Sequence, residues 1–99
     1  MDSDTLKQIR NVYDAAAEEI GLPEGWFVRV ETAEWVINEM EGYGTLGSTP
    51  LSQIAMPMVV NEEGIAHTVA EHEGPVQQVH AERYLEKGIR EHKDESRPD

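Results

Sequence analysis

The spacing of apolar residues predicts a helix near each end of the chain. In residues 4–20, and again in residues 80–93, apolar side chains recur at steps of three and four, the repeat of a helix with one buried face. Gly21 favours a left-handed stop after the first stretch, and Pro23 then prevents further helix. Gly88 lies inside the second stretch, where glycine costs about 1 kcal/mol relative to alanine. We therefore expect close packing at that position.

Alternating and apolar runs predict strands between these helices. Residues 26–31 alternate, so we expect a strand with one buried side. Residues 54–60 form an apolar run, and Pro57 within it indicates an edge strand or a bulge because proline has no amide to donate. Residues 61–64 have the composition of a hairpin turn, and residues 65–71 then return as the partner strand.

The order of these elements predicts an α+β fold. Residues 32–40 fit a short helix capped by Thr32, although their aromatic and β-branched centre would also suit a strand, and we favour the helix. Residues 42–50 have the composition of a loop. The result is a small single domain with an N-terminal helix, a small antiparallel sheet with a hairpin, and a C-terminal helix. We assign it to residues 1–93 and assign residues 94–99 to a charged, flexible tail.

The chain is strongly acidic. Twenty Asp and Glu residues against eight Lys and Arg residues give a formal net charge of −12 at pH 7. Residues 1–75 hold 14 of the acidic residues and three of the basic ones, whereas residues 76–99 are nearly balanced. Such a surface repels itself at low salt, and at about 1 M salt a Debye length of roughly 3 Å screens the repulsion. The charge fits a salt-rich cytoplasm or a basic partner, and it disfavours direct nucleic-acid binding, which depends on Lys and Arg clusters.

Composition also restricts compartment and chemistry. Cysteine is absent, so we expect neither a disulfide framework nor a thiolate site. No apolar run approaches the roughly 20 residues that a membrane span needs. Residues 1–8 lack the basic and apolar regions of a signal peptide. We therefore expect an intracellular protein that does not contact a membrane.

Residues 42–47 spell the dinucleotide-binding pattern Gly-x-Gly-x-x-Gly. That chemistry needs a strand before the pattern, a helix opening within it and an acidic residue about 20 positions later. Here Pro50 and a predicted strand follow instead, and the surrounding negative charge would repel a pyrophosphate. A loop explains the pattern better, and we expect no cofactor.

Four histidines raise the question of a metal site. Helical zinc hydrolases place two histidines at i and i+4 with a glutamate beside the first, and His67, Glu71 and His72 have the wrong order and spacing for this. On the predicted strand His67 and Glu71 share one face and His72 points away. No serine lies in a Gly-x-Ser-x-Gly turn, and the many carboxylates are those of a solvated surface. We expect no metal site and no catalytic residue, and a His/Glu metal-dependent enzyme is the least favoured interpretation.

Two stretches have the character of an interaction surface. Residues 42–61 carry no charge, and loops of this length are unusual unless they are functional or flexible. We assign the strand residues to the core and loop residues 42–52 to a contact with a partner or second subunit. The last helix adds charges of both signs. The candidate contact residues come from the loop and from this helix: Tyr43, Leu46, Leu51, Tyr84, Arg83, Lys87 and Arg90.

The C-terminal third carries a recognisable order of features. A hairpin leads into a strand that ends near His72 and Gly74, and a short linker then brings the pair Tyr84–Leu85 into the last helix. More faintly, residues 35–45 combine an aromatic start, a glutamate and a closing Gly-Thr pair. In these respects the chain resembles the tail-completion (neck, head–tail joining) proteins of tailed viruses. The likeness covers about half of the chain and departs at Glu73, where the family commonly has proline.

This resemblance implies an α+β subunit that oligomerises as a ring at the head–tail junction, without catalytic residues or cofactors. Its partners would be further copies of itself and neighbouring virion proteins, and it would reside in the virion after assembly in the host cytoplasm. The acid excess and the three lysines would then indicate a halophilic host. From the charge alone, the alternative is an acidic nucleic-acid mimic or inhibitor that binds a basic protein.

Overall fold

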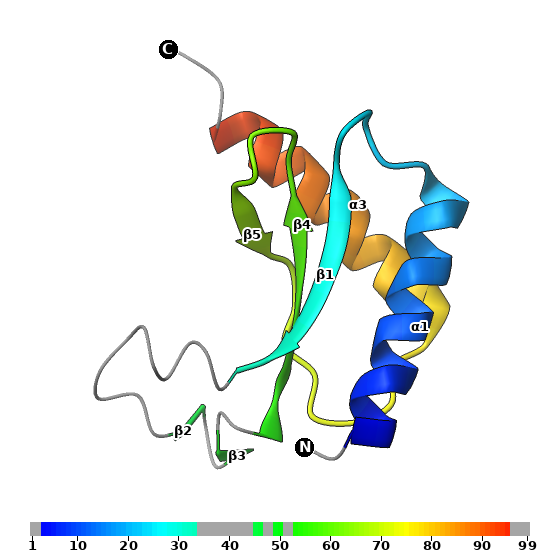
Figure 1. Cartoon of the computed structure of the whole chain (residues 1–99), viewed down its shortest axis with the longest axis vertical. Helices are drawn as coiled ribbons and strands as arrows, with labels where there is room; N and C mark the ends of the chain where they lie inside the picture. Colours follow the sequence, from blue (N-terminus) through cyan, green and yellow to red (C-terminus); the bar gives the residue numbers. More distant parts are fainter. Residues whose placement is uncertain (1–2, 34–44, 47–48, 51–52, 96–99) are drawn as a thin grey trace.

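The computed structural model describes residues 3–33, 45–46, 49–50 and 53–95. It confirms the predicted α+β class, with a helix at each end and a three-stranded antiparallel sheet between them (Figure 1). The elements are α1 (Ser3–Ile20), β1 (Phe27–Thr32), β2 (Thr45–Leu46), β3 (Thr49–Pro50), β4 (Ala55–Val60), β5 (Ala66–Thr68) and α3 (Gln78–Glu95). Both long helices extend beyond their predicted bounds by one or two residues, so α3 includes the first two residues of the predicted tail.

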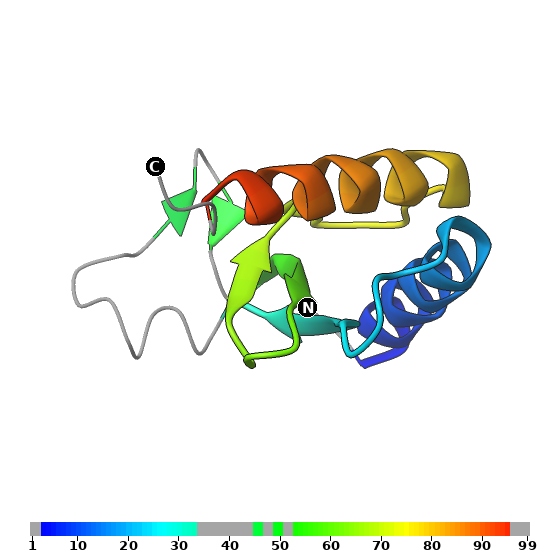
Figure 2. The same cartoon turned by 90° about the horizontal axis from the view of Figure 1, so that it is seen from above.

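The sheet and the two helices form two layers. Strand β4 lies in the centre, antiparallel to β1 on one side and to β5 on the other. Helices α1 and α3 contact each other and pack on the same side of this sheet (Figure 2). In Figure 1, α1 runs beside β1, and α3 crosses behind the strands. The main core therefore lies between the sheet and the helix pair.

Helical spacing explains which residues fill this core. In α1 the buried positions are Ile9, Tyr13 and Ala16, which follow one another at steps of four and three and so form one stripe. The sheet contributes residues from the face that meets the helices, with Val30 of β1 and Val59 of β4 among them. Burial of these apolar side chains is the main term that holds the two layers together.

Helix α3 packs closely against the strands at Gly88. A Cβ atom at this position would lie 2.0 Å from Val69 Cγ1 and 3.5 Å from Val59 Cγ2. Only a residue without a side chain fits there, so the close packing predicted at Gly88 is confirmed.

Pro57 lies in the central strand, so the prediction of an edge strand is wrong and the prediction of a bulge is right. In β4 the residue pairs with Val30 of β1, and its carbonyl accepts the amide of Val69 at 2.9 Å. The missing amide of proline therefore faces the β5 side. Farther along the same pair of strands, Ala55 of β4 forms a bridge with His72. The register of this bridge shows that the segment after β5 contains one residue more than the facing part of β4, which is a bulge.

The bulge also corrects the predicted orientation of His72. A regular strand would place His72 on the face opposite to His67, but the extra residue restores both side chains to the face that meets the helices. His67 lies against His92 of α3, with ring centroids 5.6 Å apart, and His72 lies against Tyr84 of the same helix at the same separation.

The predicted turn between β4 and β5 is confirmed. Asn61 accepts the amide of Gly64 through its carbonyl, and its side-chain Oδ1 accepts the amides of Glu63 and Ile65, each at 3.0 Å. Gly64 adopts a φ of 83°, which favours glycine. The side chain of Asn61 is thus buried because it organises the turn.

The segment between β1 and β4 differs from the prediction where it is described. Thr32, the predicted cap of the short helix, is the last residue of β1 and continues the ladder opposite Ala55. Thr45 pairs with Pro50 in a two-residue ladder within the stretch that we predicted as a loop. The remainder of the predicted short helix, residues 34–40, lies outside the described residues.

Candidate functional site

The outer side of α3 carries four of the predicted contact residues. Arg83, Lys87 and Arg90 follow one another at steps of four and three, and all three are exposed. They form a basic ridge on the side of the helix opposite its buried stripe, which contains Ala81, Leu85, Gly88 and His92. A ridge of this sign contrasts with the net charge of the chain, −12. It is suited to contact an acidic surface.

The flanks of this basic ridge are mixed in sign. Lys87 pairs with Glu91 at 3.9 Å, and Glu91 also approaches His67 Nε2 at 3.4 Å. Tyr84, the fourth contact residue on α3, is 40% exposed and lies edge-on against the ring of His72. Tyr84 therefore joins the outer surface of α3 to a buried aromatic cluster.

The three loop residues of the prediction cannot be added to this surface. Tyr43 and Leu51 lie outside the described residues. Leu46 is the second residue of β2, where it pairs with Thr49. These three remain sequence predictions.

A buried tyrosine–histidine pair joins α1 to the segment that follows β5. The Tyr13 hydroxyl and His72 Nε2 are hydrogen-bonded at 2.5 Å, and Tyr13 has no exposed surface. Burial raises the pKa of Tyr13 above its usual range, with a further contribution from Tyr84. Burial lowers the pKa of His72, with a smaller contribution from the nearby His80. Both residues are therefore neutral near pH 7, and their hydrogen bond links α1 to the segment after β5.

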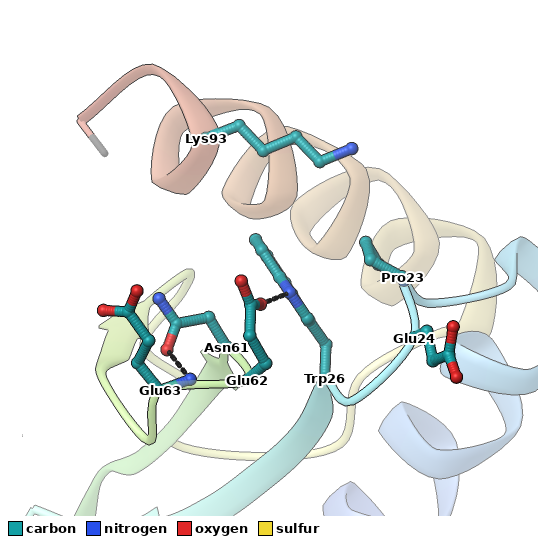
Figure 3. Close-up of a pocket in the computed structure, with 7 residues that line it drawn as sticks. All are labelled: Pro23, Glu24, Trp26, Asn61, Glu62, Glu63 and Lys93. Carbon is teal, nitrogen blue, oxygen red and sulfur yellow. Dashed lines mark hydrogen bonds between the residues drawn. The ribbon is translucent and has the colours of Figure 1, made fainter. Parts of the chain in front are cut away.

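A pocket of about 530 Å³ lies at the other end of the sheet, where the turn before β1, the hairpin turn and the end of α3 meet (Figure 3). Its lining residues are Pro23, Glu24, Trp26, Asn61, Glu62, Glu63 and Lys93. The Trp26 indole donates its Nε1–H to Glu62 Oε2, and Figure 3 shows the Glu62 carboxylate turned toward the ring. The other side of the pocket is acidic except for Lys93.

The floor of this pocket is tied to α3 through His92. The Trp26 and His92 rings lie 5.1 Å apart, and His92 Nε2 donates to the carbonyl of Ile65 at 3.0 Å. The pocket thus combines one aromatic side chain, Trp26, with three carboxylates, Glu24, Glu62 and Glu63. Such a site favours a cationic group over an anion.

The search for a metal site and for a membrane span covers the described residues. Within residues 3–33, 45–46, 49–50 and 53–95, no three His, Cys, Asp or Glu side chains converge to hold a metal ion. Glu71, which we considered beside His67 and His72, is exposed. In the same part of the chain, no helix is long and apolar enough to cross a membrane.

Two of these groupings had no signal in the sequence. Tyr13 and His72 are 59 positions apart, and Trp26 and Glu62 are 36 apart. Tyr13 was expected only as part of an apolar helix face. The hydroxyl of Tyr13 lies on the buried face of its helix, and a buried polar atom needs a hydrogen-bond partner. This requirement was the one indication in the sequence that such a partner exists.

Comparison with known proteins adds no relative. No protein-family model, no curated protein and no solved structure matches this chain significantly.

Proposed function

We propose that this chain is a non-enzymatic structural subunit of a tailed virus particle. It joins or completes the head–tail (neck) region as one member of a homo-oligomeric ring, in the virion of a virus with a halophilic host. The observation that carries this proposal is the order of features in the C-terminal third: a hairpin, a strand end at His72 and Gly74, and a helix that carries Tyr84–Leu85.

The charge distribution supports repeated contacts between copies. A ring requires a surface of one subunit to meet a different surface of the next. The basic ridge on α3 is one such surface, because every neighbouring copy offers mainly carboxylates. At about 1 M salt, long-range repulsion between acidic copies is screened, whereas groups in direct contact still interact.

The first experiment measures mass and location. Light scattering after size exclusion in about 1 M salt is expected to give a closed oligomer, and mass spectrometry of purified virus particles is expected to find the chain. Flanking genes for capsid and tail proteins would agree with both results. A strict monomer at every salt concentration, absent from particles, would contradict the proposal.

The second experiment tests the basic ridge. The variant R83A/K87A/R90A is expected to lose the ring, because it removes the three cations that form the basic ridge. The matched control Q53E/Q77E/Q78E changes the net charge by the same amount at three other exposed positions and is expected to keep it. Equal loss in both variants would assign the effect to net charge alone.

The pocket beside Trp26 favours a second candidate, an acidic inhibitor or nucleic-acid mimic that binds a basic protein. Its rim carries Glu24, Glu62 and Glu63, all exposed at one end of the molecule. The variant E24Q/E62Q/E63Q should weaken capture of a basic, DNA-binding protein, while the control E18Q/E19Q/E86Q should not. Equal capture by both variants would remove this candidate.

A further inference from the structure

Strand β1 lies at one edge of the sheet, and half of its backbone groups point away from its neighbour β4. The amide of Ala33 donates to the carbonyl of Ile54 at 2.8 Å, which fixes the alternation of bonds along the β1–β4 ladder. Residues 27, 29 and 31 direct their backbone groups toward β4, whereas Val28, Val30 and Thr32 direct theirs away from it.

Side-chain protection of this outer edge is slight. Within the described part of the chain, Arg10 Nε donates to the carbonyl of Val30 at 3.0 Å. A carbonyl oxygen has a second lone pair, so this bond does not prevent another. Nothing among the described residues pairs with the outward amides of Val28, Val30 and Thr32. Edges of this kind are templates for an added strand unless they are covered.

A crevice runs along the same edge. Its volume is about 290 Å³, and it lies between α1 and β1, lined by Arg10, Asp14, Val28, Arg29, Val30 and Glu31. The approach to the outward backbone groups is therefore open, and the crevice lies beside the strand over most of its length.

The order of charges along β1 identifies the strand that fits. Arg29 and Glu31 lie on the same face of the strand, one on each side of Val30, and they pair with each other within the chain. If a second β1 runs antiparallel and Val30 lies opposite Val30, each Arg29 lies directly opposite a Glu31. Opposite charges at such positions stabilise strand pairing, and like charges destabilise it.

We propose that β1 pairs with β1 of a second copy, antiparallel, about a two-fold axis at Val30. The outward groups of Val28, Val30 and Thr32 then bond across the junction, and the two three-stranded sheets become one. Such a contact is self-complementary and closes at two copies, so it leaves the basic ridge of α3 exposed for other contacts. It does not rest on the proposed viral function, since it follows from the edge and its charges alone.

The sharpest test uses charge reversals that are complementary only between chains. R29E places glutamate opposite glutamate, and E31R places arginine opposite arginine, so each variant alone is expected to lose the β1–β1 dimer. When the two variants are mixed, residue 29 of each chain again lies opposite a residue 31 of the opposite charge. The mixture is therefore expected to form a dimer of one R29E chain and one E31R chain. Native mass spectrometry identifies that dimer, because the two variants differ in mass. The conditions are about 0.15 M or about 1 M salt, whichever keeps the unmodified chain dimeric.

The double variant R29E/E31R supplies the control. It reverses the pair within each chain and also restores the pairing between chains, so it is expected to dimerise like the unmodified protein. If the unmodified chain is monomeric in both salts, or if the mixture of single variants gives no mixed dimer, the proposal is overturned.

Amide hydrogen exchange then locates the contact. At high protein concentration the amides of Val28, Val30 and Thr32 are expected to exchange slowly, and on dilution to exchange fast. The amides of Arg29 and Glu31 already face β4 and are expected to be unaffected by dilution. If exchange depends on protein concentration at amides of α3 but not at those of Val28, Val30 and Thr32, the dimer forms through another surface and the proposed β1 pairing is rejected.

Discussion

Helices α1 and α3 have the same length, 18 residues each, but they contact the sheet in different ways. Helix α1 inserts large side chains, Ile9 and Tyr13, into the space above β1 and β4. Helix α3 presents small residues at two of its four buried positions, Ala81 and Gly88, so its backbone comes close to β4 and the segment after β5. A side-chain contact tolerates small changes of volume, whereas a backbone contact has no room to yield.

The contact of α3 at Gly88 is expected to give the largest effect. Gly88→Val should lower the free energy of unfolding by about 3 kcal/mol, because its Cβ alone would overlap Val69. Urea unfolding followed by circular dichroism measures the loss. Gly74→Ala is the control, since nothing lies within 4 Å of a Cβ at that position, and it should stay within about 0.5 kcal/mol. Equal stability of the two variants would refute the close contact.

The contact of α1 at Tyr13 is expected to give a smaller loss. Tyr13→Phe keeps the ring but removes the hydroxyl that is hydrogen-bonded to His72, which leaves a half-buried nitrogen without this partner. The expected cost is about 1–2 kcal/mol. Tyr84→Phe, at an exposed hydroxyl on α3, should cost less than about 0.5 kcal/mol. A Tyr13→Phe protein as stable as the control would show that the hydrogen bond contributes nothing.

The same pair gives stability a dependence on pH. Because the pKa of His72 is lowered in the folded chain, the unfolded chain takes up a proton first, near pH 6.5. This contribution is therefore present above pH 6.5 and is lost as the pH falls toward the lower folded value. The stability difference between the unmodified chain and His72→Gln should be larger at about pH 7.5 than at about pH 5. Chemical denaturation at both pH values measures it, and a constant difference would contradict the shift.

The exposed side of α3 should be the least sensitive. Lys87→Ala removes the ion pair with Glu91, in which both side chains are largely in solvent. The expected loss is at most about 0.5 kcal/mol and should vanish in about 1 M salt. A larger loss that persists in salt would show that Lys87 has a packing role in the isolated chain.

The elements that follow local rules were predictable from the sequence. Both helices obey a repeat of three and four, and the turn at residues 61–64 depends on an asparagine and a glycine that act on their immediate neighbours. The exposure of Arg83 follows from the same helical repeat. The sequence was enough to predict a feature wherever its physical cause lay among residues that are close together in the chain.

Features that depend on pairing between distant strands were not predictable. The sequence around a proline does not show whether its strand is at the edge or in the centre of a sheet. For Pro57 the answer depends on which other strands pair with β4. The extra residue before His72 switches the following side chains to the opposite face of the sheet. No periodicity within residues 65–71 indicates this extra residue. The Tyr13–His72 bond depends on this bulge and was therefore missed.

The proline in the central strand makes the two halves of the sheet unequal. The ladder between β1 and β4 continues for six paired residues, whereas that between β4 and β5 contains three before the amide missing at Pro57 interrupts it. Fraying should therefore begin at β5 and reach β1 last. The molecule holds its most persistent strand pair on the β1 side of the sheet, and the strand that yields first is the one nearest to His92 and the end of α3.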